Sequence, residues 1–600
     1  MTPEPSARLG ATPVEGGVRF EVWAPNAAGV DVVADDGRTF PLTSGHAGPG
    51  TTTWAAVVAD LGSGDRYRFR LHHDDGSATD HADPASRRQP DGVHGASAVV
   101  DTAAFEWTDE GWDGIALADT VLYELHVGTF TRSGTFDSAI DQLDRLAALG
   151  VTTIEVMPVN AFPGARNWGY DGVFAYAVQE SYGGPAAFAR FIDAAHARGL
   201  GVVLDVVYNH FGPEGNVLPE FGPYLTDAYD TPWGEAVNVS REDSDAVRRY
   251  LIDNAVGWVE DFHLDGLRLD AVHAIVDLAA TTLVQELTTA VHDAAERSGR
   301  TVLVTLESAA NDPRMVRSRA EHGWGSDAVW NDDVHHCLRV ALTGEHHEYY
   351  AAYDGVGDLA AAYEHRWVYR GQHSPTLRRR HGAPADDVEP ARFIVFSQNH
   401  DHNGNTPRGE RLLHDAGPAD PRLRLAAAAI LLSPFTPMLF MGEEYGERAP
   451  FPYFIDHGDA DLVERVRQGR RREFAGNDWS GRVADPADPA TFDAAVLDPS
   501  LADHAPHAGL LAMYTELLRL RREHRVLTDP SANQSVESDA TSITVQRESD
   551  GVIARLVMTF GGAPTDHDGV TTFDTDDPRW SGDPLTADGR SFRAVLTISP

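Results

Sequence analysis

The sequence predicts a (β/α)8 TIM barrel, preceded by an immunoglobulin-like β-sandwich and followed by a small C-terminal β-domain. In the middle of the chain, amphipathic helices alternate with short, continuously apolar strands, whereas both ends carry alternating strands separated by turns. Carboxylates follow several apolar strands, as in barrels, where catalytic side chains project from the carboxyl ends of different strands. We place the three units at 1–105, 106–525 and 526–600 of the 600 residues.

The two ends of the chain have the alternation of half-buried strands. Near the N-terminus, 18–24 and 67–72 alternate apolar and polar residues and are separated by turns such as Asp35-Asp36-Gly37. From about Val526 the chain again has short alternating strands, which are expected at 542–547, 552–560 and 592–598. Each end is therefore expected to form a β-domain.

The central region repeats a helix, a glycine and an apolar strand. A helix over 140–147 precedes a strand at 152–157, and the helices 188–198, 247–262 and 282–297 precede strands at 201–208, 266–269 and 302–306. The most apolar stretch, 423–441, is interrupted by Arg424, Pro434 and Pro437, so it predicts a helix at 423–432 and a strand at 437–440 rather than a membrane span. A doubly wound sheet would also fit, but no glycine-rich phosphate loop follows an early strand.

Composition excludes several classes of function. The 49 basic residues are all arginine, so the lysine of a P-loop or of a Schiff base cannot be present. The formal net charge of −42 repels phosphate backbones and anionic lipids, so neither nucleic acid nor a membrane is expected as a partner. The single cysteine, Cys337, follows His335-His336; a buried thiol is favoured over a metal ligand. With no leader-like N-terminal segment, we expect a cytoplasmic protein without metal or cofactor.

Acidic residues stand in or just after four apolar runs that read as strands, the last of them ending at Phe396: Asp205, Asp270, Glu307 and Asp401. A single acid at a strand end is usually a helix cap or an ion-pair partner, but four together suit glycosidic bond cleavage. In that reaction one carboxylate attacks the anomeric carbon and a carboxylic acid protonates the leaving oxygen. Arg268, two positions before Asp270, lies on the same strand face and would keep Asp270 ionised.

These residues resemble the four ordered sequence regions of the α-amylase family of glycoside hydrolases. The matching segments are 205–210, 266–270, Glu307 and 399–401. The resemblance implies that Asp270 is the nucleophile, Glu307 the acid/base and Asp401 the transition-state stabiliser. It also implies that His210, Arg268 and His400 bind the sugar beside the scissile bond, with Asp205 supporting them.

Further motifs resemble those members of the family that cut the α-1,4 bond joining a maltooligosyl chain to a terminal trehalose. They lie at 162–172, 208–216, 231–235, 268–273, 311–314 and 441–445. This resemblance implies an α-glucan oligosaccharide substrate and a larger set of substrate-binding residues: Arg268, Leu269, Ala271, Val272, His273, Asp332, Asp333, Val334, His335, His336, His400, His402, Asn403, Gly404, Asn405, His210, Asp205 and Tyr170. For 332–336, capping and packing at a strand end is the competing interpretation.

Tyr170 and Trp168 could offer an aromatic platform to a sugar, and the polar turn around them favours an exposed Tyr170. The chain departs from the family pattern at Leu306 and at His402-Asn403, although the carboxylates remain. Two alternatives stay open: a branching or debranching enzyme of the same family, and an inactive glucan-binding protein, which would ordinarily have lost one of the three catalytic acids. For catalysis Glu307 must carry a proton, so its pKa is expected to be raised by apolar walls and by Asp270 and Asp401.

Overall fold

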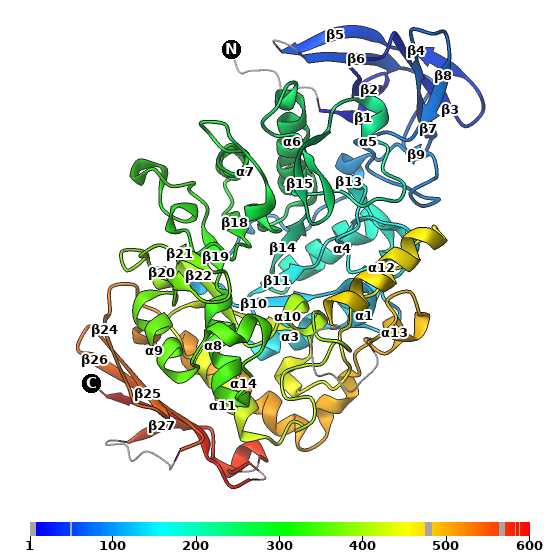
Figure 1. Cartoon of the computed structure of the whole chain (residues 1–600). Coiled ribbons are helices and arrows are strands. Elements are labelled where there is room, and N and C mark those ends of the chain that lie inside the picture. The colour runs from blue at the N-terminus through cyan, green and yellow to red at the C-terminus, as the bar shows by residue number, and fades with distance from the viewer. Residues whose placement is uncertain are drawn as a thin grey trace.

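A closed barrel of eight parallel strands forms the centre of the molecule, with one β-domain at either end (Figure 1). The structure is a computed structural model that describes residues 8–48, 51–474, 483–562, 570–582, 584–586 and 588–599. The predicted barrel with a sandwich before it and a β-domain after it is confirmed.

The N-terminal sandwich packs two antiparallel sheets face to face. One contains β1 (Gly10–Val14), β2 (Gly17–Trp23), β6 (Thr51–Val58) and β5 (Thr43–Gly48) in that order, and the other contains β4 (Thr39–Pro41), β3 (Gly29–Ala34), β7 (Arg66–His72) and β8 (Ala78–His81), with β9 (Ser97–Ala98) paired to β7. Alternate side chains point inward, so Phe20 of β2 and Tyr67 and Phe69 of β7 are buried and their rings meet edge to face. The alternating patterns at 18–24 and 67–72 therefore correspond to core strands.

The barrel strands follow one another in chain order. They are β10 (Leu122–Leu125), β11 (Thr153–Val156), β14 (Gly201–Val206), β17 (Gly266–Leu269), β18 (Leu303–Leu306), β19 (Ala328–Trp330), β22 (Phe393–Phe396) and β23 (Thr436–Phe440). Every residue of these strands is buried, as their continuous apolar runs predict for a parallel sheet covered by helices. Because the strands are parallel, their carboxyl ends meet at one rim of the barrel.

Helices surround the barrel. The longer ones are α3 (Leu143–Leu149), α4 (Gly184–His196), α6 (Ser244–Phe262), α7 (Leu283–Ser298), α8 (Asp332–Thr343), α9 (Val356–His365), α11 (Pro421–Leu431), α12 (Ala460–Glu473) and α14 (His507–Glu523). Short helices lie between them: α1 (Val127–Phe130), α2 (Phe136–Ile140), α5 (Leu218–Phe221), α10 (His400–Gly404) and α13 (Pro489–Asp493). Three hairpins join the rim, β12–β13 (Asn160–Ala161, Phe174–Val178), β15–β16 (Leu225–Thr231, Gly234–Val237) and β20–β21 (Arg370–Ser374, Arg379–Gly382).

One local expectation is corrected. The helix expected over 140–147 is two helices, α2 and α3, because the chain breaks at Asp141-Gln142 and so buries Phe136 and Ala139 of one and Leu143 and Leu146 of the other. Between β18 and β19 the chain, described throughout, forms short 3-10 turns at Pro313–Met315 and Arg319–Glu321 in place of a full barrel helix.

The C-terminal domain is one antiparallel sheet in the order β24 (Asn533–Ser538), β25 (Ser542–Ser549), β26 (Val552–Phe560), β28 (Phe592–Ser599) and β27 (Thr571–Asp574). It packs against α11, the helix predicted within the most apolar stretch of the chain. Within the described part of the chain, no helix is long and apolar enough to cross a membrane.

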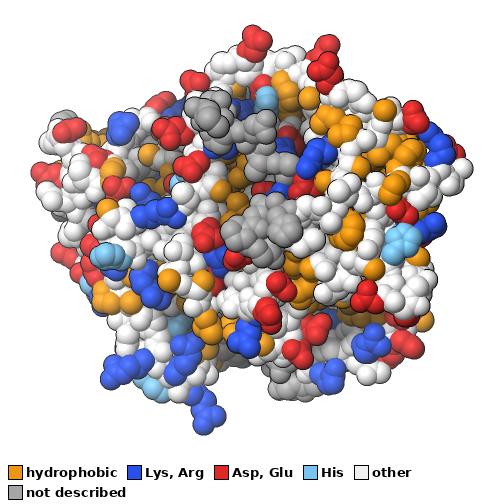
Figure 2. Space-filling view, turned by 90° about the horizontal axis from the view of Figure 1, so that it is seen from above, with side chains coloured by type: hydrophobic (Ala, Val, Ile, Leu, Met, Phe, Trp, Pro, Cys, Tyr) orange, Lys and Arg blue, Asp and Glu red, His pale blue; other side chains and the backbone are white. Residues whose placement is uncertain are grey.

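The surface reflects the acidic composition. On the face shown in Figure 2, Asp and Glu side chains are spread over the whole outline and Arg side chains lie among them. Cys337 is fully buried in α8, which confirms the buried thiol predicted from the sequence.

Candidate active site

The predicted acids meet at the carboxyl rim of the barrel. Asp205 lies in β14, Asp270 directly follows β17, Glu307 directly follows β18, and Asp401 lies in α10, which begins shortly after β22. Asp205 and Arg268 are opposite one another in the paired strands β14 and β17. The rim therefore brings together residues spread over almost 200 positions of the sequence.

Arg268 connects three of these carboxylates. One of its terminal nitrogens (Nη1) lies 2.7 Å from Asp205 and 2.9 Å from Asp270, and the other (Nη2) lies 3.2 Å from Glu307. The side chain is 1% exposed, and its guanidinium stacks 4.2 Å from the ring centroid of Trp330. Asp270 and Glu307 thus contact the same cation, which fixes their positions relative to each other.

Asp270 is held in its ionised form. Burial alone would raise its pKa, but Arg268, His210 and the side-chain N–H of Asn209 outweigh burial, so the pKa is lowered. The Asn209 amide donates to Asp270 Oδ2 at 2.6 Å. A buried carboxylate that stays charged can act as a nucleophile.

The pKa of Glu307 is shifted in the opposite direction, upward. Burial raises its pKa well above the usual value, and the nearby carboxylates of Asp270, Asp401 and Asp332 add to the effect, which Arg268 only partly offsets. The direction agrees with the sequence-based expectation. The backbone N–H of Ala271 donates to Glu307 Oε2 at 2.6 Å, and Ala271 adopts a left-handed φ of 39° there, a conformation uncommon for a residue with a side chain.

Tyr170 is less exposed than expected. Its hydroxyl donates to Asp205 Oδ2 at 2.5 Å and lies 2.9 Å from His400 Nε2, so the side chain is half-buried rather than a free platform. Trp168 is buried in the core. The other ring nitrogen of His400 bonds Glu124, whose carboxylate also accepts the backbone N–H of His400 at 2.9 Å. The pair with Glu124 outweighs the effect of burial and raises the pKa of His400.

The predicted segment 332–336 forms the first turn of α8 and divides between two roles. The carboxylate of Asp333 accepts from Asn311 at 2.9 Å, Tyr353 at 2.6 Å and the backbone of Val368 at 2.8 Å, so it holds neighbouring loops together. Asp332 faces the site, and burial raises its pKa to about 7. His335 is buried against the Ser397 carbonyl, at 2.9 Å, and its ring centroid lies 3.8 Å from that of His402.

Several other predicted residues support the site from the core. Leu269, Val272, Val334, Asn403 and Gly404 are buried, whereas His273 is exposed at the rim. The structure therefore brings the acids together with Arg268, His210, Tyr170 and His400. The five buried residues pack behind this group.

A cavity of about 540 Å³ lies beside the acids. Predicted site residues Asp332, His336 and Asn405 form part of its wall. Further lining residues that were not predicted from the sequence include Tyr349, Tyr353, Tyr369, Ser374, Leu377, His381 and Glu473. They come from a 3-10 turn, a loop, the region of the β20–β21 hairpin and the end of α12, so no single periodic pattern marks them.

Two further residues were missed by sequence reasoning. Trp233, at the tip of the β15–β16 hairpin, stacks on His210 with ring centroids 4.6 Å apart and an interplanar angle of 6°. Glu124 is a lone acid in the buried strand β10, and that mismatch with its apolar neighbours was the available signal.

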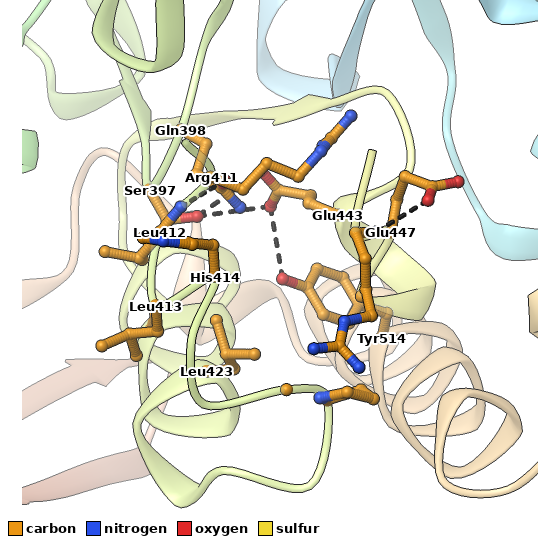
Figure 3. Close-up of a pocket in the computed structure, with 15 residues that line it drawn as sticks. Ser397, Gln398, Arg411, Leu412, Leu413, His414, Leu423, Glu443, Glu447 and Tyr514 are labelled. Carbon is orange, nitrogen blue, oxygen red and sulfur yellow. Dashed lines mark hydrogen bonds between the residues drawn. The ribbon is translucent and has the colours of Figure 1, made fainter. Parts of the chain in front are cut away.

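Figure 3 shows a second, smaller cavity, whose lining includes none of the four acids. Its volume of about 30 Å³ has room for about two water molecules. The carboxylate of Glu443 accepts from the Tyr514 hydroxyl at 3.3 Å, from Ser397 at 3.4 Å and from the backbone of Phe440 at 3.1 Å. Burial raises the pKa of Glu443 to about 8. The lining of this cavity comes from the segments that follow β22 and β23 and from α11 and α14, and the cavity is too small for a sugar.

Among the described residues there is no group of three or more His, Cys, Asp and Glu side chains arranged to hold a metal ion. The arrangement at the rim pairs a carboxyl group whose pKa is lowered, Asp270, with one whose pKa is raised, Glu307. Such pairs assign nucleophile and acid roles in enzymes that cut glycosidic bonds.

Comparison with known proteins agrees with this geometry. Residues 98–222 match the family described as alpha amylase, catalytic domain, and residues 8–86 match carbohydrate-binding module 48, the isoamylase N-terminal domain. The malto-oligosyltrehalose trehalohydrolase of Arthrobacter ramosus is 49% identical over 84% of this chain and 87% of its own length. The chain belongs to the malto-oligosyltrehalose trehalohydrolase family.

Two further proteins are similar to this chain over most of its length. The malto-oligosyltrehalose trehalohydrolase of Rhizobium sp. (strain M-11) is 42% identical over 92% of this chain and 93% of its own length. A crystal structure of a putative alpha amylase from Salmonella typhimurium superposes with a TM-score of 0.88, at 36% identity and covering 99% of both chains. The similarity therefore extends over all three parts of the fold.

Proposed function

We propose that this protein is a glycoside hydrolase that cleaves the α-1,4-glucosidic bond next to the terminal trehalose of maltooligosyltrehalose and releases trehalose. The observation that carries the proposal is the pair of carboxylates on one guanidinium, with the pKa of Asp270 lowered and that of Glu307 raised. Identity to trehalohydrolases over most of the chain supports the choice of substrate.

The proposed course is a retaining double displacement. Asp270 attacks the anomeric carbon and forms a glycosyl ester, while Glu307 gives its proton to the departing oxygen of trehalose. Glu307, now ionised, then takes a proton from water, and the water oxygen attacks the same carbon and releases the glucan chain with Asp270 restored. Asp401 stabilises the positive charge that develops on the sugar in both steps.

Binding of the sugar is assigned to the residues around these acids. His210, Arg268, His400 and Tyr170 would surround the glucose unit that reacts, with Asp205 holding Arg268 and Tyr170 in place. The trehalose unit would occupy the cavity bounded by Asp332, His336 and Asn405, whose volume of about 540 Å³ is within the range of roughly 300–1,000 Å³ common for ligand pockets. The 268–273, 332–336 and 400–405 segments thus line or support the substrate path.

The partner is a neutral glucan. The net charge of −42 disfavours nucleic acid and anionic membranes, and a single buried cysteine suits a reducing compartment, so we place the enzyme in the cytoplasm.

Product analysis tests the proposal. The protein is incubated separately with maltooligosyltrehalose, plain maltooligosaccharide and amylopectin, with Asp270→Asn as the inactive control. Free trehalose from the first substrate, and little product from the others, is the expected result. New or lost α-1,6 branches would assign a branching or debranching enzyme instead, and no product from any substrate would favour a glucan-binding protein.

A further inference from the structure

We propose that Arg470, on α12, is a positioning residue that aligns Asp401 through the side chain of Asn405. The inference rests on the proposed function in that it takes Asp401 to act on the sugar. Helix α12 comes after β23, the last barrel strand, and before α14 in chain order. Arg470 follows Asp401 by 69 positions in the sequence. No motif in the sequence connects the two.

The contacts form a short chain from the helix to the carboxylate. Arg470 Nη1 donates to Asn405 Oδ1 at 3.1 Å, and Asn405 Nδ2 donates to Asp401 Oδ1 at 2.7 Å. The second terminal nitrogen of Arg470 donates to the carbonyl of Gly404 at 2.8 Å, at the end of α10. Arg470 therefore holds both the side chain that contacts Asp401 and the last turn of the five-residue helix that carries it.

The chemistry of the amide makes this contact directional. An asparagine side chain has a donor end and an acceptor end, and it can rotate to exchange them. Arginine only donates and an ionised aspartate only accepts. With Arg470 against Oδ1, the amide must turn its NH2 toward Asp401. Without Arg470, nothing in these contacts prevents the oxygen from turning to the carboxylate, where the two acceptors would repel each other.

The guanidinium is itself held in place. It lies 5.4 Å from the ring centroid of Tyr453 and 4.9 Å from that of Phe474, and the side chain is 13% exposed. Glu473 accepts from Arg470 Nη1 at 2.9 Å and also lines the large cavity beside the acids. Two neighbouring arginines on the same helix have other surroundings. Arg467 pairs with Asp485 at 2.8 Å, and Arg472 is exposed.

The variants Arg470→Met, Arg470→Lys, Asn405→Ala and the Arg470→Met/Asn405→Ala double variant test the inference, with Arg472→Met as the matched control. We expect Arg470→Met to lower kcat about 10- to 100-fold and to change KM less than about threefold, because the lost contact is a hydrogen bond from a charged donor and the substrate is not touched. Arg470→Lys should recover part of the loss, since an ammonium can still donate to Asn405. Arg472→Met should behave as wild type.

The double variant separates a positioning role from a merely structural one. If Arg470 acts through Asn405, adding Arg470→Met to Asn405→Ala should lower kcat by less than about threefold more. Independent, multiplied losses would overturn the inference, and so would a wild-type kcat in Arg470→Met.

A crystal structure of Arg470→Met gives a result that does not depend on substrate. The inference expects the Asn405 amide to leave Asp401, and an unchanged Asn405–Asp401 hydrogen bond would overturn it. If the wild-type protein releases no trehalose, the proposed function fails while this structure still decides the role of Arg470.

Discussion

Replacing Arg268 by methionine should show how strongly one buried cation holds the acid cluster together. Methionine keeps the length of the side chain and can still pack on Trp330, but it leaves Asp205, Asp270 and Glu307 without their shared partner. Removing one partner of a buried ion pair costs about 3–5 kcal/mol. Burial already raises the pKa of Asp205, to about 6, and that of Glu307, so without the cation both take up protons more readily than Asp270 does. We therefore expect one such penalty rather than three.

The penalty should depend on pH in a defined direction. In the wild type the pKa of Asp270 is below its unfolded value of about 3.9, so its contribution to stability is present above that pH and is lost as the pH falls through the folded pKa. Without Arg268, burial dominates and the pKa rises above the unfolded value. The contribution is then lost as the pH rises, so the difference in stability between the two proteins should widen from about pH 4.5 to about pH 8.

The assay combines unfolding and activity. Thermal or urea unfolding at about pH 4.5, 6 and 8 measures the stability difference, and kcat/KM for trehalose release over the same range should show the acidic limb moved to higher pH. Arg248→Met is the matched control, because Arg248 is another buried arginine with two acidic partners, Asp277 and Glu286, away from the site. It should lose stability and keep the wild-type acidic limb. An acidic limb at the wild-type position in Arg268→Met would refute the reasoning.

Three other predictions follow from the same geometry. Glu307→Gln should lower kcat/KM for maltooligosyltrehalose about 10²- to 10⁴-fold and abolish the basic limb of its pH profile. It should leave kcat/KM for an α-glucosyl fluoride within about tenfold of wild type, because kcat/KM reports the first step and this leaving group needs no proton, while kcat falls because the second step still needs Glu307 as a base; equal losses of kcat/KM on both substrates would contradict an acid role. Gly404→Ala should destabilise the protein by about 1–3 kcal/mol in urea unfolding, because a Cβ there would lie 1.9 Å from the Trp168 ring, and an unchanged midpoint would show that the ring moves freely. Burial raises the pKa of Glu443 to about 8, so the contribution of this group to stability is present below its unfolded pKa of about 4.3 and is lost as the pH rises through 8. Glu443→Gln should remove this pH dependence and make the protein more stable than wild type at alkaline pH. Thermal unfolding at two pH values would show it.

The fold could be predicted because its elements repeat locally. The strand at 266–269 and the helices at 247–262 and 282–297 agree with β17, α6 and α7 to within a few residues, since each has its own local pattern of apolar residues. The acids could be predicted for a related reason. They stand where apolar strands end, and parallel strands bring those ends to one rim. Order along the chain was enough to place Asp270 and Glu307 on neighbouring strands, as the β17–β18 pairing confirms.

The contacts that complete the site could not be predicted in this way. Glu124 bonds His400 across 276 positions, and Arg470 bonds Asn405 across 65, so both depend on how distant elements pack. Tyr170 was expected to be exposed because it sits in a polar turn, but its hydroxyl is drawn to Asp205 and His400. Asp333 has the same residue type and neighbourhood as Asp332, and only the loops bonded to it show that it is structural.

The opposite pKa shifts of Asp270 and Glu307 follow from the charges around each carboxyl rather than from its distance to Arg268. Both contact Arg268 and both are removed from bulk water, so the guanidinium alone would favour the charged form of each. Each has one further donor, the Asn209 amide for Asp270 and the backbone N–H of Ala271 for Glu307, but Asp270 also lies in the field of His210, whereas Glu307 faces Asp401 and Asp332. One carboxyl therefore stays charged and the other keeps its proton within the same small volume. Removing a donor from Asp270, as Asn209→Leu does, would raise its pKa, narrow its difference from that of Glu307 and slow the reaction without removing either acid.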